Sequence, residues 1–495
     1  MLYTSTRGNQ EMVSAARAIT RGLADDGGLY VPQQLPVLSL DEIMAIGKKN
    51  YTARAAEILG KFLSDFSADE LGECVKKAYT KAKFGDEPAP LKHIDHATSV
   101  LELWHGPTSA FKDMALQLLP HLLTKSLEKT GENHKVVILA ATSGDTGKAA
   151  LEGFANVEGT EIIVFYPEHG VSDIQKLQMS TQQGNNVKVF GIQGNFDDAQ
   201  RGVKDIFGNV AMAEKLEEEG YIFSSANSIN WGRLVPQIVY YFSAYVDAVR
   251  AKRIKAGEKI NFAVPTGNFG NILAGYYAKM MGLPVERFIC ASNSNNVLTE
   301  FLSEGQYDRR REFFKTISPS MDILVSSNLE RLLYHVCGKD AQAVASYMQT
   351  LKEKGCYKIR RQELLKVRDD FFGAWVDEYE TKETIARVFS ELRYVMDTHT
   401  AVAWRALEKY RLVSGDGTYS VVLSTASPYK FADSVLGALG EKFDANDPFA
   451  LLHRLKEISG IKIPEQLAAL EKSPQLHDEV ISVEEMEMAV LKNLI

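Results

Sequence analysis

The feature that most constrains the fold is a series of short apolar segments that alternate with helical patterns. The first three segments are Lys135–Ala141, Glu161–Tyr166 and Val187–Ile192, and the helical patterns that follow them are Lys148–Ala155, Ser172–Gln183 and Asp197–Phe207. A strand that is apolar along its whole length needs cover on both of its faces. Strands of this kind, separated by helices, are typical of a parallel sheet with helices on either side.

A second series of the same kind follows a long helical pattern at Val235–Ala251. The remaining strands are expected at Tyr221–Ser225, Ile260–Val264, Phe288–Ala291 and Ser420–Leu423, with a helical region over about 327–411. The chain is therefore predicted to be an α/β protein with two lobes of mainly parallel sheet covered by helices. Ligands in such folds bind where the strands end, so the loops after strands are the places to look for chemistry.

We predict four segments along the chain. They are an N-terminal domain (1–95) with short helical patterns at Leu40–Ile46 and Tyr51–Leu63, a smaller α/β lobe (96–235), a larger α/β lobe (236–440) and a C-terminal helical tail (441–495).

Charge and cysteine usage exclude several classes of protein. The chain has 56 Lys and Arg against 64 Asp and Glu, a net charge of −8, whereas nucleic-acid-binding proteins usually carry a basic surplus or patch. Its four cysteines are scattered singly, without a C-x-x-C pair, which fits a reducing compartment better than a disulfide framework or a zinc site. No apolar run approaches the roughly 18 residues of a membrane span, and the start has no apolar signal region. We therefore expect a cytoplasmic protein without a metal, nucleic-acid or membrane partner.

The loop Pro265–Asn271 (PTGNFGN) joins a predicted strand to a predicted helix. Glycines let the backbone approach an anion closely, and the amides at a helix start point toward it. The loop contains no Lys or Arg, so neutral donors would hold any phosphate there. Its spacing is not G-x-G-x-x-G, so the dinucleotide fingerprint is absent. A plain turn between strand and helix is the alternative.

The loop Ala141–Lys148 (ATSGDTGK) invites interpretation as a P-loop. That interpretation fails because Thr142 stands where the first glycine is needed, and Ala149 leaves no hydroxyl for Mg²⁺. The remaining hydroxyls and amides at a helix start suit a carboxylate. The alternative is a helix that is simply capped by Ser143 or Thr146.

The segment His105–Met114 (HGPTSAFKDM) places a lysine where a structural role is unfavourable. With Ser109 as N-cap, Lys112 falls in the first helical turn, where a cation opposes the helix dipole. That field, together with the apolar Phe111 and Met114, would lower the pKa of the amine. Only a neutral amine attacks a carbonyl, so Lys112 is a candidate for Schiff-base chemistry. Most lysines, in contrast, are solvated or lie along apolar surface.

These loops and two further blocks together resemble the threonine synthases, which belong to the fold type II (tryptophan-synthase-β-like) family of pyridoxal-phosphate enzymes. The blocks are LELWHGPTSAFKD around Lys112, ATSGDTG at 141–147, SANSINWGR at 225–233, VPTGNFGN at 264–271 and LSTASPYKF at 423–431. They stand in the family's order, from YTSTRG at Tyr3–Gly8 to Phe431, and the length resembles the longer enterobacterial and fungal branch. A single such block would be weak evidence, whereas five in order are specific.

The resemblance implies pyridoxal 5'-phosphate as cofactor and a role for each matching residue. Lys112 would form the Schiff base, Phe111 would pack against the ring, and Thr425 would face the pyridine nitrogen with a neutral hydroxyl. The loop for the cofactor phosphate corresponds to Gly267, Asn268, Phe269, Gly270 and Asn271. The loop that grips the substrate carboxylate corresponds to Thr142, Ser143, Asp145 and Thr146. The substrate phosphate is assigned to Asn227, Ser228, Asn230 and Arg233, because a guanidinium is the natural planar partner of phosphate oxygens.

The reaction that the resemblance implies is the conversion of O-phospho-L-homoserine and water to L-threonine and phosphate. A phospho-lyase or a serine/threonine dehydratase of the same fold would use the same lysine and glycine loop, so both stay as alternatives. The block at 225–233 and the YTSTRG start favour the synthase. A non-enzymatic binding protein would show a missing lysine or a broken glycine loop, and neither is seen. The sequence leaves open whether the protein is a monomer or a homodimer, and whether Thr4–Gly8 extends to the active site.

Overall fold

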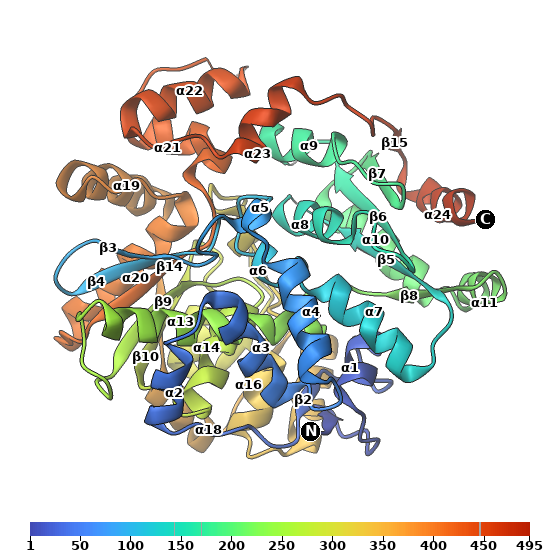
Figure 1. Cartoon of the computed structure of the whole chain (residues 1–495), viewed down its shortest axis with the longest axis horizontal. Coiled ribbons are helices and arrows are strands. Elements are labelled where there is room, and N and C mark those ends of the chain that lie inside the picture. Colours follow the sequence, from blue (N-terminus) through green and yellow to red (C-terminus); the bar gives the residue numbers. More distant parts are fainter. Residues whose placement is uncertain (143, 170, 445–446) are drawn as a thin grey trace.

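The computed structural model describes residues 1–495 except 143, 170 and 445–446. The larger of its two main sheets has the order β13 (Phe371–Trp375), β10 (Val285–Ser292), β9 (Ile260–Pro265), β14 (Ser420–Ser424), β4 (Thr98–Glu102) and β3 (Leu91–His93), and only β3 and β4 pair antiparallel. The smaller sheet is parallel throughout, in the order β15 (Val480–Ile481), β7 (Val187–Ile192), β6 (Thr160–Pro167), β5 (Lys135–Ala141) and β8 (Tyr221–Ser224). The two sheets lie at the left and right of Figure 1. The predicted fold class, two lobes of mainly parallel sheet covered by helices, is confirmed.

Alternate residues of the smaller sheet face two separate cores, which is why its strands are apolar throughout. In β5, Val136 and Ile138 belong to the main core of the molecule, together with residues of α7 (Leu119–Thr130) and α8 (Asp145–Phe154). Val137 and Leu139 belong to an outer core, which is closed by α10 (Phe196–Gly208), α11 (Val210–Glu218) and α24 (Met486–Leu494). Each such side chain contributes about 1.5–3 kcal/mol when it leaves water, so both faces stabilise the sheet.

The larger sheet is covered in the same way. The main core includes Phe262 of β9 and Leu423 of β14, with residues of α13 (Pro236–Arg250) and α14 (Gly270–Met280). On the opposite face Ala263 and Val422 pack with residues of α19 (Glu378–Leu392) and α20 (Thr398–Ser414). The carboxyl ends of β9 and β14 are therefore fixed from both sides.

Shorter elements complete the chain. The remaining helices are α1 (Ala15–Arg21), α2 (Leu40–Ile46), α3 (Tyr51–Phe62), α4 (Ala68–Ala78), α5 (Lys81–Phe84), α6 (Asp113–Leu116), α9 (Asp173–Ser180), α12 (Trp231–Leu234), α15 (Val297–Glu304), α16 (Leu329–Val336), α17 (Ala341–Lys354), α18 (Arg361–Asp370), α21 (Ala432–Ala438), α22 (Pro448–Ser459) and α23 (Glu465–Ala468). Short 3₁₀ helices are η1 (Pro319–Met321), η2 (Pro428–Phe431), η3 (Ala469–Lys472) and η4 (Val483–Glu485). Two small antiparallel pairs join β1 (Tyr3–Ser5) to β2 (Tyr30–Pro32) and β11 (Gln306–Asp308) to β12 (Cys356–Lys358).

All seven predicted strands are present, but three strands of the larger sheet, β3, β4 and β13, escaped the sequence patterns. Strand β4, which lies between β14 and the edge strand β3, contains buried polar residues, and their partners lie far along the chain: Arg411 donates to Thr98 Oγ1 (3.0 Å) and Tyr394 to Glu102 Oε1 (3.1 Å). The predicted helical region over 327–411 is wrong at β12 and at β13, which joins the edge of the sheet beside β10. A strand with buried polar residues, such as β4, or a strand at the edge of a sheet, such as β13, does not show a regular apolar pattern in the local sequence.

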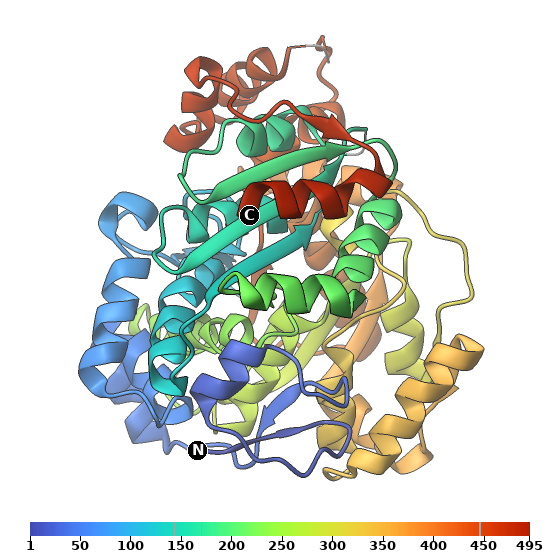
Figure 2. The ribbon, with the colours of Figure 1, turned by 90° about the vertical axis from the view of Figure 1, so that its right-hand side faces the viewer.

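The C-terminal segment crosses from one lobe to the other. In Figure 1 it runs from α21 and α22 past α9 to β15 and α24, and Figure 2 shows α24 lying across the smaller sheet. The segment predicted as a helical tail (441–495) thus also contains β15, which pairs with β7. Likewise β4 falls in the segment predicted for the smaller lobe (96–235) but pairs with β14 in the larger sheet. The limits of the four segments stay a prediction.

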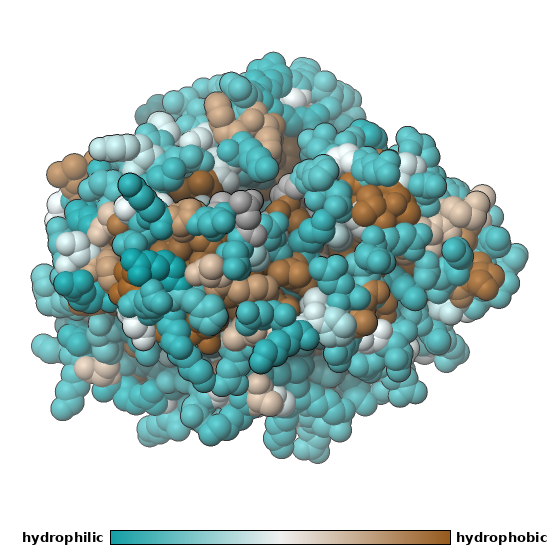
Figure 3. Space-filling model, turned by 90° about the horizontal axis from the view of Figure 1, so that it is seen from above, coloured by the Kyte–Doolittle hydropathy of each residue, from teal (hydrophilic) through white to brown (hydrophobic). Residues whose placement is uncertain are grey.

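The surface seen in Figure 3 is largely hydrophilic, with apolar side chains gathered in small, separate patches. Among the residues that the structure describes, no helix combines the length and apolar character that crossing a membrane requires.

The close approach of α8 to the end of α6 depends on Gly153, where an added Cβ would lie 2.0 Å from the backbone oxygen of Leu116. We expect Gly153→Ala to destabilise the protein by about 1–3 kcal/mol, because a backbone atom cannot move aside cheaply. Gly72→Ala in α4 is the matched control, since no atom lies within 4 Å of its added Cβ, and it should be neutral or stabilising. Urea-unfolding midpoints followed by circular dichroism measure both variants. Equal midpoints for the two would contradict the packing argument.

Candidate active site

A cavity of about 390 Å³ opens where strands of both sheets end. Ala141 ends β5, Thr266 follows β9 and Thr425 follows β14, and all three line it. Of the residues singled out in the sequence, the following line this cavity: Phe111, Lys112, Thr142, Asp145, Thr146, Asn227, Ser228, Arg233, Gly267, Asn268, Phe269, Gly270, Asn271 and Thr425. Asn230 does not line it, and Ser143 lies outside the described residues. The structure thus brings together five sequence blocks that span more than 300 residues.

Lys112 lies on the cavity wall with its side chain largely buried. Its Nζ donates to Ser320 Oγ at 3.2 Å, and it lies 3.6 Å from Asp145 Oδ2 and 5.1 Å from the centroid of the Phe111 ring. Burial lowers the pKa of Lys112; Asp145 opposes this shift, and the cations Arg233 and Lys430 add to it. The neutral amine, which is the form that attacks carbonyls, is therefore favoured more than in a solvated lysine.

The expected N-cap role of Ser109 is wrong. Ser109 has a φ of 59°, and α6 begins only at Asp113, with Lys112 itself in the N-cap position. Backbone pairing to the chain after β14 holds this segment instead: Phe111 N donates to Thr425 O (2.8 Å) and Ser427 N to Ser109 O (3.0 Å). Lys112 is thus positioned by long-range pairing, because the segment before it is not a helix.

Two buried carboxylates flank Lys112 in different ways. Asp113 turns to Thr108, whose N and Oγ1 both donate to it at 2.8 Å, and burial raises the pKa of Asp113 to about 7. Asp145, at the start of α8, accepts from Gln175 Nε2 (2.9 Å) and pairs with Lys430 Nζ (2.6 Å). Burial by itself would raise the pKa of Asp145, but the nearby positive charge, above all that of Lys430, holds the pKa below its usual range. Asp145 is therefore an anion that faces two lysines.

The glycine loop after β9 presents neutral donors to the cavity. Phe269 has a φ of 63° and precedes α14, and its ring packs on Phe371 with centroids 5.7 Å apart. Tyr240 and Tyr241 donate to Asn271 Oδ1 at 2.6 and 2.9 Å. This leaves Asn271 Nδ2 buried without a hydrogen-bond partner among the described residues. A buried amide donor without a partner costs free energy, and a phosphate oxygen would satisfy it.

The loop before α8 is organised by Thr142. Its hydroxyl accepts from the backbone amides of Gly144 (3.0 Å) and Gly147 (2.9 Å), and Gly144 is the N-cap of α8 without a capping side chain. Capping by Thr146 is therefore not observed. The start of α8 and the Thr146 side chain face the cavity, which suits an anionic group of modest size.

Arg233 is a buried cation on the cavity wall. One of its guanidinium nitrogens donates to Ala226 O at 2.8 Å, and no carboxylate of the described residues lies within ion-pair distance of it. Burial lowers the pKa of Arg233 to about 10, which still leaves it charged at neutral pH. A buried charge without a counter-ion is unfavourable, so this position calls for an anionic ligand.

Asn230 caps the start of α12, the helix that carries Arg233. Its Oδ1 accepts from Gly232 N (2.9 Å) at the start of α12, and its Nδ2 donates to Ile19 O (2.9 Å) of the N-terminal region. The side-chain amide is thus engaged away from the cavity.

Sequence reasoning missed several residues that complete the site. Ser320 Oγ accepts from Lys112, and Ser320 N donates to His399 Nε2 at 3.1 Å. His399 Nδ1 faces the buried Asp397 Oδ2 at 2.7 Å, so the ring proton is placed on that side. Gln175 stood only within the helical pattern predicted at Ser172–Gln183. Lys430 lay within the LSTASPYKF block, but nothing in its local sequence indicates that it reaches Asp145.

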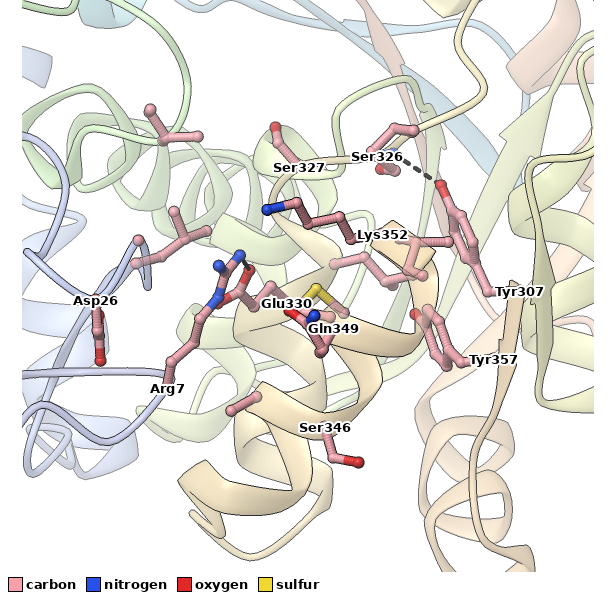
Figure 4. A pocket seen from close by; sticks show the side chains of 18 of the residues that line it. Arg7, Asp26, Tyr307, Ser326, Ser327, Glu330, Ser346, Gln349, Lys352 and Tyr357 are labelled. Atoms are coloured by element: carbon pink, nitrogen blue, oxygen red, sulfur yellow. Dashed lines mark hydrogen bonds and ion pairs between the residues drawn. The ribbon is translucent and has the colours of Figure 1, made fainter. Parts of the chain in front are cut away.

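A second cavity, of about 900 Å³, shares Val325 with the first, and Figure 4 shows side chains that line it. Ser326 lines it, and the hydroxyl of Ser326 donates to Gly267 O (2.7 Å) in the glycine loop. Arg7 also lines it and forms two hydrogen bonds with Glu330, at 2.9 and 2.8 Å. The segment Thr4–Gly8 therefore brings Arg7 to this second cavity, and Arg7 is not among the residues that line the first.

Three family models match the chain in succession. Their descriptions are threonine synthase N terminus (residues 2–79), pyridoxal-phosphate dependent enzyme (residues 90–356) and threonine synthase, C-terminal (residues 400–495). The middle match contains Lys112, Arg233 and the glycine loop.

Similar proteins extend over nearly the whole chain. Human threonine synthase-like 1 is 39% identical over 498 positions, covering 98% of this chain, which spans just under two thirds (66%) of the human protein. The threonine synthase of Pseudomonas aeruginosa is 40% identical over 436 positions, covering 88% of this chain and 90% of that protein. The crystal structure of PLP-bound threonine synthase from Brucella melitensis matches with a TM-score of 0.89 at 37% identity, covering 100% of this chain and 99% of that chain.

Close packing behind the glycine loop provides a direct test of its geometry. An added Cβ at Gly267 would lie 2.6 Å from the backbone oxygen of Ser320, next to the hydroxyl that binds Lys112. We expect Gly267→Ala to weaken binding of pyridoxal phosphate by about tenfold or more, because the loop must shift. Gly437→Ala, with no atom within 4 Å of its added Cβ, serves as control. Titration of the cofactor by visible absorbance measures both, and unchanged affinity in Gly267→Ala would show that the loop does not hold it.

Proposed function

Because the chain belongs to the threonine synthase family of pyridoxal-phosphate-dependent enzymes, we propose that it converts O-phospho-L-homoserine and water to L-threonine and phosphate. The observation that carries the proposal is one cavity that combines the amine of Lys112 with two separate anion positions, the glycine loop and Arg233. A phosphorylated cofactor and a phosphorylated substrate together require two such positions.

The residues present fit pyridoxal 5'-phosphate. The buried Asn271 Nδ2 and the backbone at the start of α14 offer neutral donors for its phosphate, and Lys112 offers an amine for its aldehyde. Phe111 would pack against the ring and Thr425 would face the ring nitrogen. When bound, the cofactor supplies an aldehyde to which amines attach and a ring system that stabilises negative charge on the neighbouring carbon.

Lys112 has two tasks in this proposal. It anchors the cofactor between turnovers, and when the substrate amine takes its place it moves the proton at the substrate Cα. Both tasks need an uncharged amine, which burial favours. Ser320 orients Nζ, and the Asp397–His399 pair holds Ser320 in place through its backbone amide.

The substrate is bound at both of its ends. Arg233, with Asn227 and Ser228 beside it, takes the phosphate, because its guanidinium is a buried charge that lacks an acidic partner among the described residues. The start of α8 with Thr142 and Thr146 takes the carboxylate, and Ser143 is proposed for the same loop. The sequence also assigned Asp145 to this carboxylate, but two anions repel, and Asp145 pairs with Lys430 instead. Asn230 supports Arg233 from behind.

A phospho-lyase or serine/threonine dehydratase is the alternative within the same fold. The buried, unpaired Arg233 disfavours a dehydratase for unphosphorylated substrates, since no substrate phosphate would then neutralise it. Incubating the purified chain with O-phospho-L-homoserine or with phosphothreonine, and identifying the amino or keto acid released with phosphate, separates the three reactions.

Location and assembly belong to the same proposal. The chain acts on a small molecule, and its four cysteines are all free, in line with a cytoplasmic site of action. A monomer or a homodimer without nucleic acid is proposed. Size-exclusion chromatography with light scattering tests the assembly.

Lys112→Ala should abolish threonine formation and the visible absorbance of the bound cofactor, because Lys112 is the buried lysine of the cavity wall, whereas Lys204, the other lysine among the described residues that line it, is exposed. Borohydride reduction should label the wild-type protein at Lys112 alone. Lys188→Ala, an exposed lysine on β7, is the control and should match the wild type in rate and spectrum. A near-normal rate in Lys112→Ala would falsify the assigned chemistry.

Arg233→Ala should weaken binding of O-phospho-L-homoserine by about 10- to 100-fold while the cofactor is retained, because a charged hydrogen-bonding partner of the substrate phosphate is lost. Isothermal titration and cofactor absorbance measure the two effects separately. Arg233→Lys keeps the charge but not the planar fork and should recover only part of the affinity. If the cofactor is lost instead, Arg233 serves the other phosphate.

A further inference from the structure

Lys430 is a buried lysine with a fixed arrangement of partners. Its side chain is 0% exposed, and its Nζ lies 2.6 Å from Asp145 Oδ1 and donates to Thr108 O at 3.0 Å. It is not among the residues that line the cavity. Lys430 therefore contacts the segment that carries Lys112 and the carboxylate opposite Lys112, without access to ligands.

Asp145 is shared between two lysines at unequal distances. Its Oδ1 is 2.6 Å from Lys430 and accepts from Gln175, whereas its Oδ2 is 3.6 Å from Lys112, outside hydrogen-bond range. A carboxylate with only one ammonium beside it would favour the protonated form of that amine. In this structure the Asp145 carboxylate lies closer to Lys430 than to Lys112, so Lys430 is its main counter-ion.

The other charged groups around Lys112 either favour its uncharged form or are turned away from it. Arg233 on α12 adds positive charge from the cavity side. Asp113, on the helix of Lys112 itself, is turned to Thr108, and His399 on α20 reaches Lys112 only through Ser320. Asp322 and Asp197 also line the cavity, but Asp322 accepts from Asn293 and Thr316, at 2.7 Å each, and Asp197 is exposed. Asp145, whose carboxylate lies 3.6 Å from Lys112 Nζ, is thus the anion that could keep Lys112 protonated, and Lys430 is the cation placed to prevent it.

We propose that Lys430 is a positioning residue that binds the Asp145 carboxylate away from Lys112 and so leaves Lys112 as the uncharged amine. This inference rests on the proposed role of Lys112. Lys430 keeps Asp145 ionised. Asp145 Oδ2 lies 3.6 Å from Lys112 Nζ, so its negative charge can stabilise Lys112 when this amine takes up a proton during turnover.

The test measures the pH at which Lys112 becomes an uncharged, reactive amine. The cofactor-free full-length chain is labelled with a trace of acetic anhydride across a pH series, and the peptide that contains Lys112 is quantified by mass spectrometry, with the exposed Lys188 as internal reference. In Lys430→Met the Lys112 midpoint should rise by about one to three pH units, because Asp145 then has only Lys112 as its cation. At a fixed pH below the midpoint, each unit lowers the reactive fraction about tenfold. Lys430→Arg keeps the charge and should restore the wild-type midpoint.

The double variant Asp145→Asn, Lys430→Met separates a charge effect from disturbed packing. It lacks both charges, so the rise seen in Lys430→Met should vanish. Asp145→Asn alone should lower the midpoint, because two cations then face Lys112 without an anion, and this comparison holds even if Lys430→Met does not fold. An unchanged midpoint in Lys430→Met, or a rise that persists in the double variant, overturns the proposal, as does an unchanged midpoint in Asp145→Asn. Labelling reads the ionisation of Lys112 whether or not threonine forms, so a normal labelling series without product contradicts the proposed function alone.

Discussion

The backbone pairing between the segment before Lys112 and the chain after β14 is the interaction on which the site depends. Phe111 N binds Thr425 O, Ser427 N binds Ser109 O, and Ala110 and Ala426 form an antiparallel bridge. Buried backbone groups must find partners, so these bonds hold an otherwise irregular segment in one conformation. They also place Lys112 beside Thr425, which the sequence separates by more than 300 residues. From the C-terminal segment Gln466 adds bonds to Gly106 O (2.9 Å) and Ser109 Oγ (3.0 Å).

Three buried basic side chains near this segment, Lys430, Arg233 and Lys112, have their charge compensated in different ways. Lys430 has a permanent partner in Asp145 and no access to the cavity, so it acts on Lys112 as a fixed charge. Arg233 lines the cavity and has no acidic partner among the described residues, so its counter-ion must come with the ligand. Lys112 itself is driven toward neutrality by burial. Because charges interact strongly in a poorly solvated interior, small differences in access give three similar side chains three different roles.

The N-terminal region supports the glycine loop from behind. Arg331, which is fully buried, donates to Tyr30 O at 3.0 Å, to Ile229 O at 2.6 Å and to Asn328 Oδ1. Asn328 in turn donates twice to Asn268 O, both times at 3.1 Å. The Arg331 side chain thus links Tyr30 of the N-terminal region to Ile229, in the block that also contains Arg233, and through Asn328 to the glycine loop. This gives residues 1–95 a structural task at the site, although none of them lines the Lys112 cavity.

The sequence by itself determined the two-lobed α/β fold, because strands covered on both faces must be apolar throughout, and it located Lys112, the glycine loop and Arg233 through local motifs. Only the tertiary structure decided which side chains complete the site. The polar strand β4, the Ser320–His399–Asp397 chain and the pairing of Lys430 with Asp145 all join residues that are far apart in sequence, so no local periodicity or spacing records them. Ser109 shows the same limit: its sequence suits a helix cap, but backbone bonds to Ser427 take the segment out of the helix. Local chemistry is set by neighbours along the chain, whereas the charge state of a buried group is set by neighbours in space.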